Sequence, residues 1–279
     1  EILFRDEVVK SFSLLDLVVL CRSADQLREA IAETQALIRI ESSSPQLEKD
    51  PIAKKEFEDR FVAAKQTQQM LLQATLDQPQ LSDWYSNGSK EELRSKKEMQ
   101  QLLSRVLETV YSKSPLIYNE LINRDVPSSQ SIGARNKLLF AMLRREGAVE
   151  LGIEKSPPEK AIYRSLLLAT GIHREDSDGK WYFTDPRESG GRQGRGDIKE
   201  SMSAVWGRIV EFFESTVESP RSFEELRDEL VSPPYGIKAG VLPILYFAAY
   251  LAYRDEMAIF ENRRFRPAFD EESVARFIK

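Results

Sequence analysis

The chain has 279 residues and a mass of 32.0 kDa; 41% of the residues are hydrophobic and 30% are charged. This composition is typical of folded globular protein, and it excludes collagen, a wholly disordered chain and a membrane-spanning chain. Lys and Arg number 40 against 45 Asp and Glu, a net charge of -5, so any nucleic-acid-binding surface must be a local patch.

The chain contains one cysteine, Cys21, and one histidine, His173. This excludes a disulfide framework and zinc sites built from Cys and His. The scarcity of cysteine and the lack of a secretory signal predict a cytoplasmic protein that does not associate with membranes. Because the sequence begins at Glu1 rather than Met, within apolar periodic sequence, we expect a piece of a longer polypeptide.

Residues 1–89 are predicted to form a helical region. Apolar side chains recur at helical spacing in residues 24–40 and 51–77, and the polar loop SSSPQLEKD joins these two helices. The apolar run 12–21 is compatible with a strand or a buried helix, and we favour a helix. We interpret residues 83–89, which contain the turn signal Asn87-Gly88, as a loop.

From residue 90 onward the sequence contains an approximate repeat, best seen in residues 104–143 and 207–249. In both stretches a long amphipathic helix ends at a Ser-Pro pair, Ser114-Pro115 and Ser219-Pro220. A short helix with a Glu-Leu pair should follow, and then a turn and a strongly apolar third helix. We therefore expect residues 102–145 and 205–254 to superpose.

A hairpin is predicted after each third helix. The first lies in residues 172–186, following a helix at 157–169, and has its turn at Asp178-Gly179; the second lies in 257–267. Three helices closed by a hairpin are typical of a winged helix. The predicted fold is mainly α, with a helical region (1–89) and two tandem winged-helix-like units (90–188 and 189–279) that have short β-hairpins. The alternative is an irregular helical domain with two unrelated hairpins.

The dense apolar helix faces predict the core, and the glycine-rich stretch 188–197 predicts a flexible connector. The residues expected to be almost fully buried are Leu138, Leu139, Leu166, Leu167, Leu242, Leu245 and Phe247.

The sequence offers no catalytic motif. His173 has no cysteine or GxSxG serine near it and is interpreted as structural. Asp176 and Asp178 lie in a predicted tight turn, which favours turn formation over metal binding. We predict no catalytic residue, no metal site and no cofactor, although enzymatic activity stays open as a third class of function.

Two groups of residues are candidates for nucleic-acid binding. Arg135, Asn136 and Lys137 lie one turn into the first unit's third helix, where a recognition helix contacts DNA. The second wing carries a basic cluster suited to phosphate contact, which consists of Arg263, Arg264 and Arg266. The first wing tip is acidic, and the second unit's third helix is apolar on nearly every face, so we expect neither to bind DNA.

Four stretches carry a resemblance to a known family: NELINR (119–124), GARNKLLFAML (133–143), LGIEKSPPEKAIYRSLLLATGIHR (151–174) and SPPYGIKAGVLPILYFAAYLAYRDEMAIFE (232–261). Residues 80–279 resemble the C-terminal part of large prokaryotic P-loop ATPases of phage-defence loci, similar in plan to those of BREX-type systems. The resemblance implies an upstream ATPase module and a region that engages DNA or partner subunits. No Walker residue occurs in this chain, so no ATPase residue is carried over.

The sequence thus predicts a non-catalytic region of a larger ATPase that engages duplex DNA or other subunits of a defence complex. The alternative is a protein–protein docking scaffold that does not bind nucleic acid. In that case, the interface should lie near Trp84, Tyr85, Trp181 and Tyr182.

Overall fold

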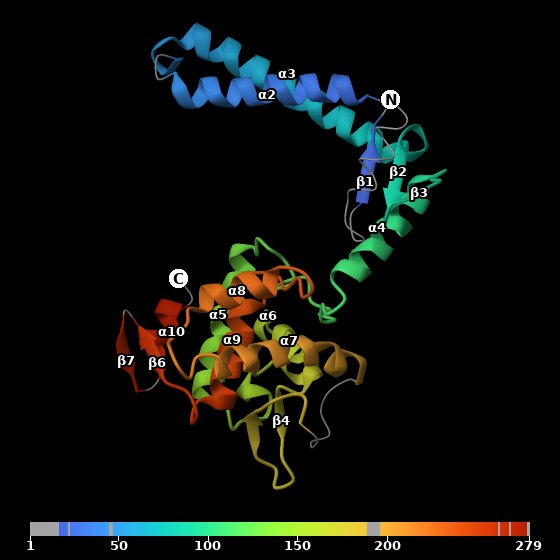
Figure 1. Ribbon diagram of the computed structural model, residues 1–279. Coiled ribbons are helices and arrows are strands. Elements are labelled where there is room, and N and C mark those ends of the chain that lie inside the picture. Colours follow the sequence, from blue (N-terminus) through green and yellow to red (C-terminus); the bar gives the residue numbers. More distant parts are fainter. Residues whose placement is uncertain are drawn as a thin grey trace. The chain divides into compact units, whose positions relative to one another are not determined.

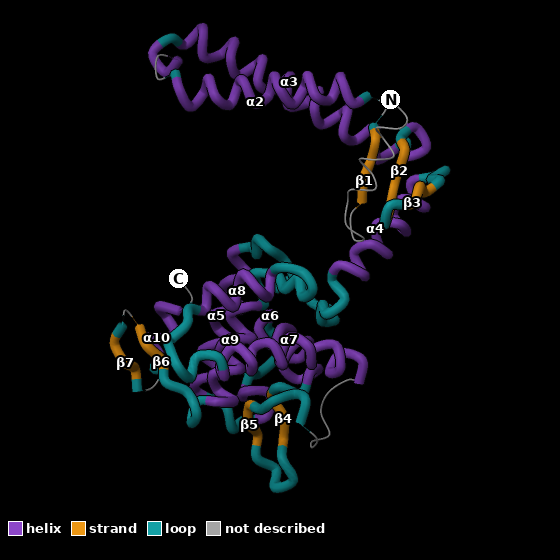
Figure 2. Tube along the Cα trace, viewed as in Figure 1, coloured by secondary structure: helices purple, strands orange, loops and turns teal. Residues whose placement is uncertain are grey.

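The computed structural model describes residues 17–21, 23–44, 47–188, 196–261, 263–267 and 269–277. The chain is mainly helical, with small antiparallel sheets of two or three strands (Figures 1 and 2). Its contacts divide it into two compact units, Glu1–Val110 and Tyr111–Lys279. From here on, the first unit and the second unit are these two ranges and not the predicted winged-helix-like units. The division into three domains, 1–89, 90–188 and 189–279, stays a prediction. The predicted connector lies mostly outside the described residues.

Two long antiparallel helices dominate the first unit, as predicted. They are α2 (Ala24–Ser43) and α3 (Pro51–Asp77), with a short 3-10 turn, Leu47–Lys49, between them. The Asp50 carboxylate caps α3, because it accepts hydrogen bonds from the backbone N–H groups of Ile52 and Ala53 at 3.0 and 3.1 Å.

A three-stranded sheet, β1 (Leu17–Leu20), β2 (Asp83–Ser86) and β3 (Ser89–Glu91), completes the first unit together with the 3-10 turn Pro79–Leu81 and α4 (Lys96–Val110). The helix favoured for residues 12–21 is wrong where the structure describes it, because residues 17–20 pair with β2. The loop interpretation of 83–89 is also wrong. Asn87 and Gly88 have φ of 51° and 73°, which is typical of the turn that joins two strands of a hairpin.

The second unit contains the remaining helices and two hairpins. Its helical segments are α5 (Ser129–Arg144), a 3-10 segment (Val149–Gly152), α6 (Pro158–Tyr163), a π-helical turn (Arg164–Leu168), α7 (Gly196–Glu214), α8 (Phe223–Val231), α9 (Leu242–Tyr253) and α10 (Glu271–Phe277). Its hairpins are β4–β5 (His173–Glu175 and Trp181–Phe183) and β6–β7 (Ile259–Glu261 and Arg264–Arg266). Both hairpins lie where the sequence predicts them.

One hydrophobic core serves the whole second unit and draws side chains from α5 to α10. All seven predicted core residues are buried, with exposed fractions between 0% and 4%. The first unit has a smaller core around Trp84, Leu93, Met99 and Leu102. No helix among the described residues has both the length and the apolar character needed to cross a bilayer.

The repeat is only partly reproduced in the structure. The predicted short helix is present in the second stretch as α8, where Ser222 and Glu225 form a capping box. It is absent from the first, in which residues 111–128 form turns at 111–113 and 120–122 and are otherwise irregular. The Asn119 side chain accepts a hydrogen bond from the backbone N–H of Leu121, and such a local bond competes with helix formation. A winged-helix arrangement stays a prediction.

Candidate nucleic-acid interface

The structure places Arg135 and Asn136 in the second turn of α5 and Lys137 at the start of the third. The Ser128 hydroxyl caps this helix by accepting a hydrogen bond from the backbone N–H of Ser131 at 3.2 Å. Residues on the other side of α5, including Leu138, pack in the core, so the helix is firmly held. Lys137 is exposed, while Arg135 and Asn136 are half-buried.

Arg135 is a partly desolvated cation. Its Nε and Nη2 lie 3.4 Å from the Asn136 side-chain oxygen, and within the described residues it forms no ion pair. Burial lowers the pKa of Arg135, but an arginine stays charged at neutral pH. A half-buried guanidinium without a carboxylate favours an incoming anion, because part of its desolvation cost is already met in the free protein.

The second group of cations lies on the β6–β7 hairpin. Arg266 is engaged, since it binds the Glu261 carboxylate at 2.7 and 2.9 Å. Arg263, in the turn with φ of 63°, and Arg264, in β7, are exposed and form no ion pair in the part of the chain that is described. Of the three predicted hairpin arginines, Arg263 and Arg264 are thus free to bind phosphate.

The hairpin is connected to α5 through α10. Glu261 binds Arg276 of α10, and Glu271 of α10 binds Arg144 at the end of α5. Arg135 precedes Arg144 by nine residues, which corresponds to about 14 Å of helix. No hydrogen bond or ion pair among the described residues joins the two groups of cations. The cations of α5 and the cations of the β6–β7 hairpin are therefore two separate positively charged sites on the second unit.

The exposed aromatic side chains Phe260 and Phe265 were missed by the sequence analysis. They are 50% and 57% exposed, and they lie directly opposite each other in β6 and β7. Once the position of the hairpin turn is known, the spacing of Phe260 and Phe265 around it predicts that the two residues are cross-strand partners. Only the tertiary structure shows that no helix of the described part of the chain covers them.

The residues interpreted as structural have structural roles. His173 is fully buried, with Nδ1 2.9 Å from the Tyr163 hydroxyl and Nε2 2.8 Å from the Glu146 carbonyl oxygen. Burial lowers the pKa of His173. The Asp176 carboxylate accepts hydrogen bonds from the backbone N–H groups of Asp178 and Lys180 and so forms the predicted turn. Within the described ranges, no cluster of His, Cys, Asp or Glu could hold a metal ion.

The aromatic docking surface expected under the alternative function is wrong in its main members. Trp84 and Trp181 are buried, with exposed fractions of 2% and 7%. The Trp84 indole donates a hydrogen bond to the Pro79 carbonyl oxygen at 2.9 Å and belongs to the first unit's core. Trp181 packs against His173, with ring centroids 5.2 Å apart.

A different apolar surface lies on the α2–α3 pair. The two helices face each other along a seam of buried and half-buried residues, which includes Ala30, Leu37, Phe61, Leu71 and Thr75. The next residue in the sequence after each of these is an exposed aliphatic one. These five exposed residues, here called the outer face, are Ile31, Ile38, Val62, Leu72 and Leu76. In an antiparallel helix pair, the residues one position after each seam residue lie on the same side of both helices. The residues one position before each seam residue lie on the other side. Glu33 and Arg60 lie on that other side and form an ion pair at 3.0 Å. The aliphatic residues of the outer face therefore lie on one side of the pair, interspersed with charged residues such as Glu58 and Lys65.

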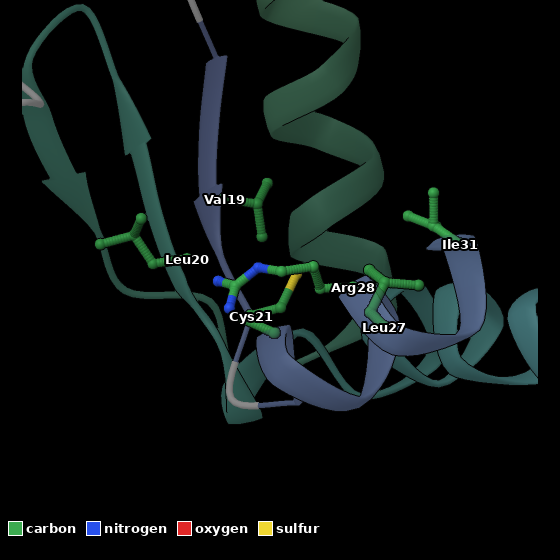
Figure 3. A pocket seen from close by; sticks show the side chains of 7 residues that line it. Val19, Leu20, Cys21, Leu27, Arg28 and Ile31 are labelled. Carbon is green, nitrogen blue, oxygen red and sulfur yellow. The ribbon is translucent and has the colours of Figure 1, made fainter. Parts of the chain in front are cut away.

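An open cavity of about 400 Å³ adjoins the outer face where β1 leads into α2. It is lined by Val19, Leu20, Cys21, Ala24, Leu27, Arg28 and Ile31. Figure 3 shows the Arg28 side chain reaching from α2 toward Val19 and Cys21 at the end of β1. The lining is mostly aliphatic, and Arg28 also binds Asp25 at 2.8 Å. The cavity therefore fits an apolar side chain better than a polar substrate.

Comparison with known proteins identifies no relative, since no family model, curated protein or solved structure matches the chain.

Proposed function

We propose that this chain is a non-catalytic region of a larger ATPase of bacterial phage defence, and that its second unit binds duplex DNA without sequence preference. The resemblance of residues 80–279 to such ATPases supports the ATPase context and other defence subunits as partners, and the scarcity of cysteine supports a cytoplasmic location. The charges of the second unit support binding to phosphates.

One observation carries the DNA-binding proposal. Most arginines of the second unit form ion pairs, as expected for a chain with more acidic than basic residues. Among the described residues of this unit, Lys113, Arg145, Lys155, Lys180 and Lys199 form no ion pair, and Arg145 and Lys199 bind backbone carbonyl oxygens instead. Of the predicted binding residues, Arg135, Lys137, Arg263 and Arg264 also form none within the described ranges. These free cations lie on a helix held by the core and on a hairpin connected to it. They can bind phosphates without first breaking an internal ion pair.

Two features support a lack of sequence preference: the free cations are suited to phosphates, and most of α9 is buried. Eight of the twelve residues of α9 are buried, so this helix cannot enter a major groove. Contacts to phosphates position a protein on DNA but do not distinguish base pairs. Affinity should therefore depend strongly on salt and little on sequence.

Fluorescence anisotropy with a labelled duplex at two salt concentrations tests the proposal. In Arg263→Ala with Arg264→Ala, the slope of log affinity against log salt should become shallower by about one for each lost phosphate contact. Arg124→Ala with Arg227→Ala is a matched control, because both arginines are about half exposed but bind Glu120 and Asp228. No binding at low salt, or equal effects of the two double variants, would contradict the proposal.

A second candidate function, protein docking, is favoured by the outer face of α2 and α3. We propose a second copy of this chain as its partner, because the charges around Val62 are self-complementary. Glu58 and Lys65 lie on the same side of α3, four residues before and three residues after Val62. A two-fold axis near Val62 would place Glu58 of each copy opposite Lys65 of the other.

Sedimentation equilibrium tests this docking. The native chain should dimerise, and Glu58→Lys or Lys65→Glu alone should weaken the dimer by placing like charges opposite each other. The double variant should restore it. A monomer at all concentrations, or no restoration in the double variant, would exclude self-association through the outer face.

A further inference from the structure

The two exposed phenylalanines of the β6–β7 hairpin form an aromatic pair. The ring centroids of Phe260 and Phe265 are 5.8 Å apart, and the ring planes are inclined by 60°. Other phenylalanines of this unit, such as Phe183 and Phe247, are buried in its core. At least half of the surface of each of these two neighbouring side chains is exposed to water, and exposed apolar surface of this kind is suited to a ligand.

The hairpin separates its aromatic and charged side chains by strand alternation. Phe260 and Phe265 are directly paired, while the flanking pair Glu261 and Arg264 occupies positions of opposite orientation. Glu261 is already neutralised, since Arg266 and Arg276 both bind its carboxylate. An anion that approaches the hairpin therefore meets Arg263 and Arg264 without competition from this carboxylate.

We propose that Phe260 and Phe265 bind an unpaired base of single-stranded nucleic acid by stacking on one face of the hairpin, while Arg263 in the turn binds the adjoining phosphate. This inference rests on the proposed function and names the form of nucleic acid that the hairpin prefers. Aromatic rings beside cations are the combination with which proteins bind single strands without sequence preference.

The preference for single strands has a simple geometric reason. In a duplex, each base is stacked between its neighbours, so its face is not available to a protein side chain without the cost of unstacking. An unpaired nucleotide offers both its face and its phosphate. The arginines can bind either form of nucleic acid, but the rings can bind only the unpaired one.

Anisotropy with a labelled single strand, and with the duplex of the same sequence, tests the inference on the full chain. Phe260→Ala with Phe265→Ala should weaken single-strand binding about 5-fold or more, the loss expected for one stacked base, and should leave duplex binding unchanged. Tyr118→Ala is the control, because Tyr118 is 68% exposed in the same unit but lies outside the hairpin. Equal losses for both ligands, or no loss, would overturn the inference.

A spectroscopic variant measures stacking directly. In Phe265→Trp, a saturating single strand should quench the fluorescence of the new indole, and the duplex should not. The native tryptophans, Trp84, Trp181 and Trp206, are buried and give a constant background. Binding without quenching would overturn stacking. A native chain that binds both ligands equally overturns the inference alone, whereas one that binds neither overturns the proposed function as well.

Discussion

Arg276 of α10 binds both carboxylate oxygens of Glu261 in β6, at 2.5 and 3.1 Å. The hydrogen bond from Arg276 is the main reason that the pKa of Glu261 is lowered, so this carboxylate is charged at neutral pH. The contact connects the basic hairpin to the last described helix. It determines how firmly the proposed ligand-binding side chains are held.

Glu261→Gln should loosen the hairpin, because the amide cannot form the charge-assisted hydrogen bonds that hold Arg276. Backbone amides of β6 and β7 should exchange with deuterium faster, while exchange in α9 stays the same. Glu120→Gln is a suitable control, since Glu120 binds Arg124 within one local turn. Unchanged exchange in the hairpin would show that Arg276 does not hold it.

Leu139→Ala should destabilise the second unit by about 2 to 5 kcal/mol, the usual cost of a cavity at a fully buried leucine. Leu139 is 0% exposed, in the core that α5 shares with α9. Val217→Ala, at a residue that is 87% exposed, should change the free energy of unfolding by less than about 0.5 kcal/mol. Urea denaturation measures both, and similar losses would contradict the assigned core.

Stability should decrease as the pH falls below about 6.5, the ordinary pKa of histidine. The pKa of buried His173 is lowered in the folded chain, so below that pH the unfolded chain binds a proton that the folded chain does not. The free energy of unfolding should then fall by up to about 1.4 kcal/mol per pH unit until the lowered pKa is reached.

His173 is the single histidine of the chain, so His173→Gln provides the reference for this pH dependence. Urea denaturation of both proteins between pH 7.5 and pH 5.5 should show the decrease in the native chain alone. Parallel pH profiles would contradict the role of His173.

The same substitution should have opposite effects at two glycines of the second unit. A Cβ atom at Gly240 would lie 2.2 Å from the Ile122 carbonyl oxygen, so Gly240→Ala should destabilise by about 1 to 3 kcal/mol or more. A Cβ atom added at Gly133, in α5, would have no described atom within 4 Å apart from the neighbouring backbone of its own helix. Gly133→Ala should therefore raise the free energy of unfolding by about 0.4 to 1 kcal/mol. Melting temperatures that move in the same direction would contradict this.

The candidate site was partly visible in the sequence. Arg135 lies on a helix and Arg264 on a hairpin, as predicted, because periodicity and turn residues act over a few neighbouring positions. The sequence did not show that Glu261 engages Arg266, or that Phe260 and Phe265 stay uncovered. The first property depends on the register of β6 and β7, which brings Glu261 and Arg266 together, and the second depends on how the rest of the unit packs around the hairpin.

The sequence by itself determined the long helices of residues 24–40 and 51–77, both predicted hairpins and the buried leucines. Each depends on local spacing and on apolar side chains that must leave water. Only the tertiary structure decided that residues 17–20 form a strand, since their partner β2 lies more than sixty residues away. It also decided that residues 111–128 form turns and irregular chain rather than a helix. There, Asn119 and the close approach of Gly240 to Ile122 satisfy or constrain backbone groups that a helix would otherwise pair internally.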